Sequence, residues 1–189
     1  MKTSLFLALA LVLAVPARLV AADSSPNEAV AAAAKKLADQ PNYSWKTVVV
    51  VPESVQFKPG PTDGKTEKDG FTCASTSFGD NGIDMVKKGD KGAITDNEGN
   101  WKLGSELEKE EGPGRFLSFM VKGLKTPAEQ VGDLVAGAKE MKHDGEIYAG
   151  VLTAEGVKKQ YRFGEPKDPK GSFKIWVKDG MVVKFEVKL

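Results

Sequence analysis

The sequence predicts an α+β fold, in which helices pack on an antiparallel sheet. Two segments begin with the same helix-start pattern, a hydroxyl residue followed by proline and, two residues later, glutamate. Between and after them, apolar and polar residues alternate in short segments separated by glycine-rich turns, which is typical of antiparallel strands. The last nineteen residues alternate in the same way on both sides of an Asp-Gly pair. This ending predicts a hairpin.

The two helix starts lie at residues 25–28 and 126–129. In each, the hydroxyl residue is the N-cap, proline occupies the first helical position, and glutamate completes a capping box. Pro41 ends the first helix. Each predicted helix carries one apolar stripe: Val30, Ala33, Ala34, Leu37 and Ala38 in the first, and Val131, Leu134, Val135, Ala138 and Met141 in the second. Each helix is therefore expected to lie on another element.

Short turns between the two helices predict an antiparallel meander. The expected strands are residues 43–51, 70–78, 83–88, 91–95 and one beginning at residue 101. After the second helix we expect a strand over residues 146–152, a short helix capped by Thr153, and the terminal hairpin. Residues 58–68 and 164–170 are expected to be exposed loops.

The terminal hairpin is predicted to turn through a three-residue loop, residues 178–180, with Gly180 in the left-handed conformation. This register pairs Phe173 with Phe185, Ile175 with Val183 and Val177 with Met181. A two-residue turn at Asp179 and Gly180 would pair apolar with charged residues and mix the two faces of the sheet. The predicted register places Trp176 on the outer face with Lys174, Val182 and Lys184, facing a loop or a contact surface.

Residues 1–22 have the pattern of a secretory signal peptide, with Lys2 ahead of a short apolar run and small residues up to Ala22. We therefore expect a periplasmic or secreted protein with a single domain over residues 23–189. Without Lys2 and Arg18, 25 basic and 26 acidic residues remain, which favours no nucleic-acid partner. We also expect no stable membrane insertion, because the apolar run is too short to span a membrane comfortably. The protein is expected to be a monomer.

The segment 112–124 is apolar around most of a helical circumference and has glycines at both ends. A short helix of this kind is buried on several sides or moves between burial sites. One interpretation is a core helix between the sheet and the second helix. The other is a lid over an apolar cavity, hinged at Gly114 and Gly123. The sequence leaves both open, although buried aromatic stripes usually mean packing.

No catalytic residue, metal ligand or cofactor is predicted, and we expect a protein that is not an enzyme. The single histidine, His143, lies in a polar segment expected to be a turn between helix and strand. Cys73 is expected to be a small buried residue, and as the only cysteine it forms no intramolecular disulfide. Residues 96–100 are predicted to form a hairpin turn, because they lack the spacing of a calcium loop.

The order of the elements, with the segments NYSWKTVVV, DNEGNWKL, IYAGVLTAEG and FKIWVKDGMVVKFEV, resembles the extracytoplasmic lipoprotein-carrier superfamily. That group includes the periplasmic carrier of outer-membrane lipoproteins and mycobacterial lipid-carrier lipoproteins. The resemblance implies a strongly curved half-barrel sheet with helices packed on its concave face, sometimes around a cavity for acyl chains. The candidate residues for lining such a cavity or forming its lid are Trp45, Phe116, Phe119, Met120, Leu134, Ile175 and Phe185.

Two functional hypotheses follow. In the first, the exported protein binds or carries a lipid or another hydrophobic ligand beneath helices that move. In the second, the helices fill the sheet completely and the protein is an interaction or structural module of the cell envelope. Fold alone does not decide between them. A carrier needs an apolar space of several hundred Å³, on the order of 300–1,000 Å³.

Overall fold

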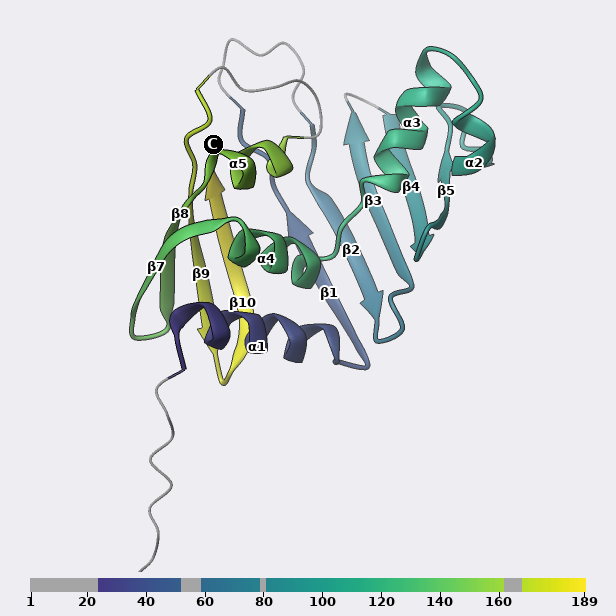
Figure 1. The fold of residues 1–189 in the computed structure, drawn as a ribbon. Coiled ribbons are helices and arrows are strands. Elements are labelled where there is room, and N and C mark those ends of the chain that lie inside the picture. Colours follow the sequence, from purple (N-terminus) through teal and green to yellow (C-terminus); the bar gives the residue numbers. More distant parts are fainter. Residues whose placement is uncertain (1–23, 52–58, 79–80, 162–167) are drawn as a thin grey trace, which may run out of the picture.

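The computed structural model describes residues 24–51, 59–78, 81–161 and 168–189. Figure 1 shows helices in front of two groups of strands. The α+β class predicted from the sequence is confirmed. The predicted signal peptide lies outside the described residues.

The strands form two antiparallel sheets. The six-stranded sheet follows chain order and contains β1 (Asn42–Thr47), β2 (Thr62–Glu67), β3 (Thr72–Phe78), β4 (Asn81–Lys88), β5 (Lys91–Thr95) and β6 (Trp101–Leu103). The four-stranded sheet has the order β10-β9-β8-β7 and contains β7 (Ala138–Asp144), β8 (Ile147–Leu152), β9 (Ser172–Lys178) and β10 (Met181–Lys188).

The helices divide between the two sheets (Figure 1). They are α1 (Pro26–Ala38), α2 (Gly104–Leu107), α3 (Pro113–Lys122), α4 (Pro127–Ala136) and α5 (Ala154–Gln160). Helices α1, α4 and α5 share a hydrophobic cluster with the four-stranded sheet, which we call the first cluster. Helices α2 and α3 lie over β4 and β5 and form the second cluster. Strand β1 touches both, since Tyr43 packs against the first cluster and Trp45 against the second.

Both predicted capping boxes are present. At the start of α1, Ser25 Oγ accepts a hydrogen bond from Glu28 N at 3.3 Å, and Glu28 Oε2 accepts one from Ser25 N at 2.9 Å. At α4 the corresponding distances between Thr126 and Glu129 are 3.2 Å and 2.7 Å. The hydrogen bonds from Ser25, first from its backbone N–H, lower the pKa of Glu28. The capping patterns in the sequence therefore place the starts of both helices correctly.

Two strands were not predicted from the sequence. Strand β2 was expected to be part of a loop because its sequence, TDGKTE, carries no apolar alternation. Its inward positions are instead Gly64 and Thr66, which are buried beneath neighbouring side chains. Strand β7 was read as the end of the α4 helix. The helix stops at Ala136, and a register shift between Ala138 and Glu140 accompanies the pairing of β7 with β8.

The predicted register of the terminal hairpin is wrong. The turn has two residues, Asp179 and Gly180, with φ values of 53° and 70°. Ile175 pairs with Phe185, and Phe173 pairs with Val187. A register shift between Val182 and Lys184 adds one residue to β10 and so keeps apolar residues on the inner face. With this bulge, a two-residue turn no longer places apolar and charged residues on the same face of the sheet.

The bulge also changes the outer face of this hairpin. Trp176 lies there as predicted, half-buried, and Lys184 Nζ is 4.5 Å from the centre of its indole ring. Val182, predicted to share this face, is only 5% exposed and belongs to the first cluster. Lys174 pairs with Glu186, so the predicted opposition of Lys174 and Lys184 does not occur.

Candidate ligand-binding site

The seven candidate residues do not meet around one cavity. Leu134 and Ile175 are both 0% exposed in the first cluster, and Phe185 packs against them. Met120 is 7% exposed in the second cluster, with Trp45 packed against that cluster. Phe116 and Phe119 are 40% and 51% exposed. The sequence identified core residues of both halves, together with the exposed aromatic flank of α3.

Trp45 is held against the six-stranded sheet by its neighbours on β2. A Cβ atom added at Gly64 would lie 2.2 Å from the indole of Trp45, so glycine is needed for this close approach. The indole Nε1 donates a hydrogen bond to Thr66 Oγ1 at 3.0 Å. Thr66 and Thr72 are also joined through their hydroxyl groups at 3.2 Å. Trp45 is thus a fixed part of the sheet surface.

The carboxyl-terminal half of α3 is fixed by close packing on two glycines. Added Cβ atoms would lie 2.6 Å from Val121 Cγ2 at Gly92 and 2.9 Å from Val121 Cγ1 at Gly104. The buried Ser118 Oγ donates a hydrogen bond to the carbonyl of Gly104 at 2.9 Å. These contacts place Val121 between β5 and the start of α2.

An ion pair also joins α3 to the end of α2. Lys122 Nζ lies 2.5 Å from Glu108 Oε2. The hydrogen bond from Lys122, and then its positive charge, lower the pKa of Glu108. Both side chains are substantially exposed, so the pair adds little to the stability of the whole protein.

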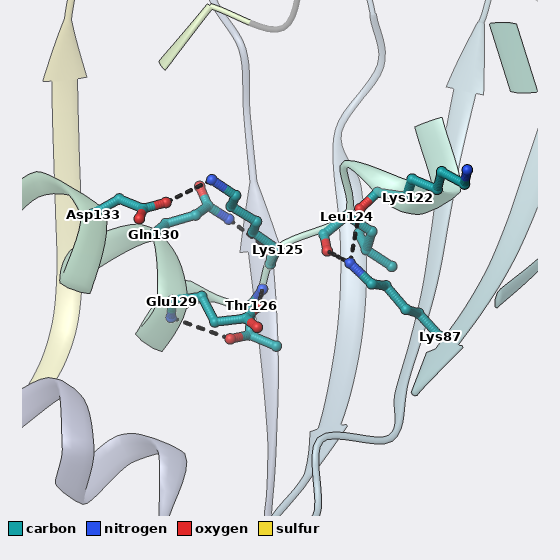
Figure 2. Close-up of polar contacts among 8 residues, drawn as sticks. All are labelled: Lys87, Lys122, Leu124, Lys125, Thr126, Glu129, Gln130 and Asp133. Atoms are coloured by element: carbon teal, nitrogen blue, oxygen red, sulfur yellow. Dashed lines mark hydrogen bonds and ion pairs between the residues drawn. The ribbon is translucent and has the colours of Figure 1, made fainter. Parts of the chain in front are cut away.

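The connection between α3 and α4, residues 123–126, is anchored at both ends (Figure 2). On one side, Lys87 Nζ of β4 donates to the carbonyls of Lys122 and Leu124, each at 2.8 Å. This is a favourable position for a cation, at the carboxyl end of a helix.

On the other side of the connection, two side chains of α4 reach back to Lys125 (Figure 2). Gln130 Nε2 donates to the Lys125 carbonyl at 2.9 Å, and Lys125 Nζ lies 2.6 Å from Asp133 Oδ2. Gly123, a hinge only in the lid interpretation, therefore lies between two anchored residues.

A groove of about 760 Å³ lies beside the carboxyl end of α3. Its apolar part comes from Gly92, Leu103, Gly104 and Val121. Its polar part is Lys87, Asp90, Lys91, Ser105, Glu108 and Lys122. None of the seven candidate residues lines it. The sequence signal that was missed is the pair Gly92 and Gly104, whose small size lets Val121 pack against β5 and α2 beside the groove.

A second depression, of about 360 Å³, lies on the outer face of the four-stranded sheet. Its lining includes Ala149, Val151 and Ser172 among charged side chains of both signs. Val151 is 50% exposed, and Ile147, beside Trp176 on this face, is 38% exposed. The outer face is therefore a mixed surface of apolar and charged groups.

The reactive side chains lie away from the groove. Cys73, predicted to be buried, is exposed, because the inward positions of β3 are Thr72, Ala74 and Thr76. His143 lies on β7 instead of in a turn, and its ring stacks on Tyr148 with centroids 5.6 Å apart. Within the described ranges, no three His, Cys, Asp or Glu side chains are grouped to hold a metal ion.

The turn at residues 96–100 is confirmed as a hairpin turn between β5 and β6. Asp96 Oδ1 accepts hydrogen bonds from Glu98 N at 3.0 Å and from Asn100 N at 2.9 Å. In the part of the chain that the structure describes, no helix has the length and apolar character needed to cross a membrane.

Comparison with known proteins gives a distant structural similarity. No family model matches the chain, and no curated protein matches its sequence. The crystal structure of LprF from Mycobacterium bovis superposes with a TM-score of 0.48 at 10% sequence identity, over 87% of this chain and 86% of that one. Similarity at this level assigns neither a family nor a ligand to the chain.

Proposed function

We propose that the protein is a non-catalytic binder of a lipid or another hydrophobic molecule, which it holds in the groove beside α3. The observation that carries this proposal is the groove itself. Its volume of about 760 Å³ falls within the range typical of ligand pockets, about 300–1,000 Å³. Leu103, 52% exposed, offers apolar surface to an acyl chain at its edge.

The position of the groove also supports binding. Its walls come from the β4–β5 turn, the start of α2 and the end of α3. The glycines at positions 92 and 104 let Val121 of α3 pack closely against β5 and α2, and none of these elements belongs to the first cluster. A ligand could therefore enter without displacing the first cluster, where Leu134 and Ile175 are completely buried.

We also propose that the protein acts outside the cytoplasm, in the periplasm or as a secreted protein. The signal-peptide pattern of residues 1–22 supports this location. A role without catalysis is supported by the positions of His143 and Cys73, neither of which lines the groove. Binding alone would then be the activity.

The test is a titration with dioctanoylglycerol, an uncharged two-chain lipid, followed by methyl NMR. We expect shifts of the Leu103 and Val121 methyl signals, which report on the groove. Ser105→Trp should block these shifts by filling the groove from α2. Ser172→Trp is the matched control, since it makes the same change at an exposed position in the outer depression. If Leu103 and Val121 do not respond to the lipid, the proposal is wrong.

One observation favours the alternative function, an interaction module of the cell envelope. The outer face of the four-stranded sheet carries Trp176, Ile147 and Val151 at its surface. Lipid-induced shifts at Val151 that Ser172→Trp abolishes, without shifts at Val121, would move the binding surface to this face.

A further inference from the structure

We infer that the ligand of this groove is an amphiphile with an anionic head group, which Lys87 and Lys91 bind while its apolar part lies on the exposed side chain of Leu103. The inference rests on the proposed function and names its ligand class. It follows from the distribution of charge around the groove.

Lys87 is a cation held in a defined place. It is half-buried, and two of its hydrogen bonds go to the carbonyls of Lys122 and Leu124 at 2.8 Å (Figure 2). An ammonium group has three N–H donors, so one donor remains. Among the described residues no carboxylate forms an ion pair with Lys87. The carbonyls orient this charge without cancelling it.

The other charges of the groove leave a positive excess. Lys122 and Glu108 neutralise one another as an ion pair. Lys87 and Lys91 then face a single remaining acid, Asp90. Lys91 is exposed and, within the described part of the chain, takes part in no ion pair. An anion near both lysines would gain charge-assisted hydrogen bonds that an uncharged head group lacks.

The apolar and cationic parts are adjacent because Leu103, Lys87 and Lys91 line the same groove. A ligand whose apolar chain lies on Leu103 therefore has its polar end near the two lysines. This arrangement suits a molecule with one acidic end and one apolar end.

The experiment compares four molecules by methyl NMR of Leu103 and Val121. They are dioctanoyl phosphatidic acid, dioctanoyl phosphatidylcholine, dioctanoylglycerol and glycerol 3-phosphate. We expect phosphatidic acid to bind about tenfold more tightly than either lipid without net charge. One additional hydrogen bond between charged groups is enough to lower the dissociation constant by about this factor. High salt should reduce this preference, since exposed charges are screened.

The outcomes separate the inference from the proposed function. Equal affinity for all three lipids would overturn the inference and leave the proposed function intact. Binding of none of them would overturn both. If glycerol 3-phosphate binds as tightly as phosphatidic acid, the groove is an anion site without an acyl site, and the inference is wrong.

Three variants connect the preference to its residues. Lys91→Gln should reduce the advantage of phosphatidic acid several-fold without altering folding, because its side chain makes no described contact. Lys87→Gln should reduce the preference for phosphatidic acid further, although this substitution also removes the two hydrogen bonds to the carbonyls of Lys122 and Leu124. Lys65→Gln, an exposed change on β2 outside the groove, is the control. An unchanged preference in Lys91→Gln and Lys87→Gln would contradict the assignment.

Discussion

The two halves of the molecule, each a sheet with the helices that cover it, differ in how completely their side chains are buried. Over the four-stranded sheet, three helices bury Val30, Val131, Leu134, Val157 and Ile175 to 0% exposure. Over β4, β5 and β6 of the six-stranded sheet, α2 and α3 supply the helical cover, and among the described residues there the large side chains buried to 1% or less are Ile94 and Val121. The first half has the packing of a completed core.

The difference bears on the question that the sequence left open. A completely packed core and the proposed ligand site are compatible, because the packed core lies in one half and the groove lies in the other. The second half has Leu103, Phe116 and Phe119 at its surface, each at least 40% exposed, and a groove beside α3. If this comparison is right, equal changes in the two halves should have unequal effects.

The largest expected effect is that of truncating a side chain in the first cluster. Leu134→Ala should lower the free energy of unfolding by about 2–5 kcal/mol, since a completely buried side chain leaves a cavity. Met120→Ala removes a side chain of similar size from the second cluster and should cost less than half as much, because its exposed neighbours can relax. Urea denaturation measures both. Equal losses would mean that the two halves are equally filled.

A smaller effect is expected where α3 approaches β5. Gly92→Ala should cost about 1–3 kcal/mol, because its new Cβ would overlap Val121 and overpack the contact. Gly82→Ala is the matched control, since a Cβ atom there meets no atom within 4 Å.

Adding Val121→Ala to Gly92→Ala provides a second check of this contact. The double variant should be more stable than the sum of the two single changes predicts, because Val121→Ala removes the methyl group that the new Cβ meets. Simple additivity would show that this overlap does not limit the position of α3.

The turn of the terminal hairpin provides a third prediction, in the plugged half. Asp179→Val should cost about 1–2 kcal/mol, because a β-branched residue would have to adopt the left-handed conformation observed at this position. Lys178→Val is the control, as residue 178 ends β9. Equal urea midpoints for the two variants would favour the three-residue loop, in which only Gly180 needs positive φ.

Local signals in the sequence predicted much of the fold. Capping boxes at Ser25 and Thr126 depend on residues three positions apart, so the sequence shows them directly. The turn at residues 96–100 and the short helix after Thr153 were recognised in the same way. Strand β2 was missed because its place depends on Trp45 and Thr66, which only the folded sheet brings together.

The candidate site was harder to predict for the same reason. The hydrophobicity of Phe116 and Met120 indicates burial and not the presence of a cavity. The close approach of α3 beside the groove depends on Gly92 and Gly104, twelve residues apart, each touching Val121 from a different element. No periodic pattern encodes such a contact. The bulge in β10 could not be predicted either, because the inserted residue shifts the alternation of apolar and polar residues from which the register was predicted.

The smallest expected effect concerns Glu108, which joins α2 to α3 at the groove. Lys122 lowers the pKa of Glu108 in the folded protein below its ordinary value of 4.5. The ionised carboxylate therefore stabilises the folded state at pH values above the ordinary pKa. This contribution is lost as the pH falls through the lowered pKa. Glu108→Gln should therefore destabilise slightly at neutral pH and not at all in acid. Urea midpoints measured from neutral pH to below pH 4 test this. Glu111→Gln, which removes an exposed carboxylate that forms no ion pair among the described residues, is the control. A difference between wild type and Glu108→Gln that persists unchanged in acid would show that the ion pair does not join the two helices.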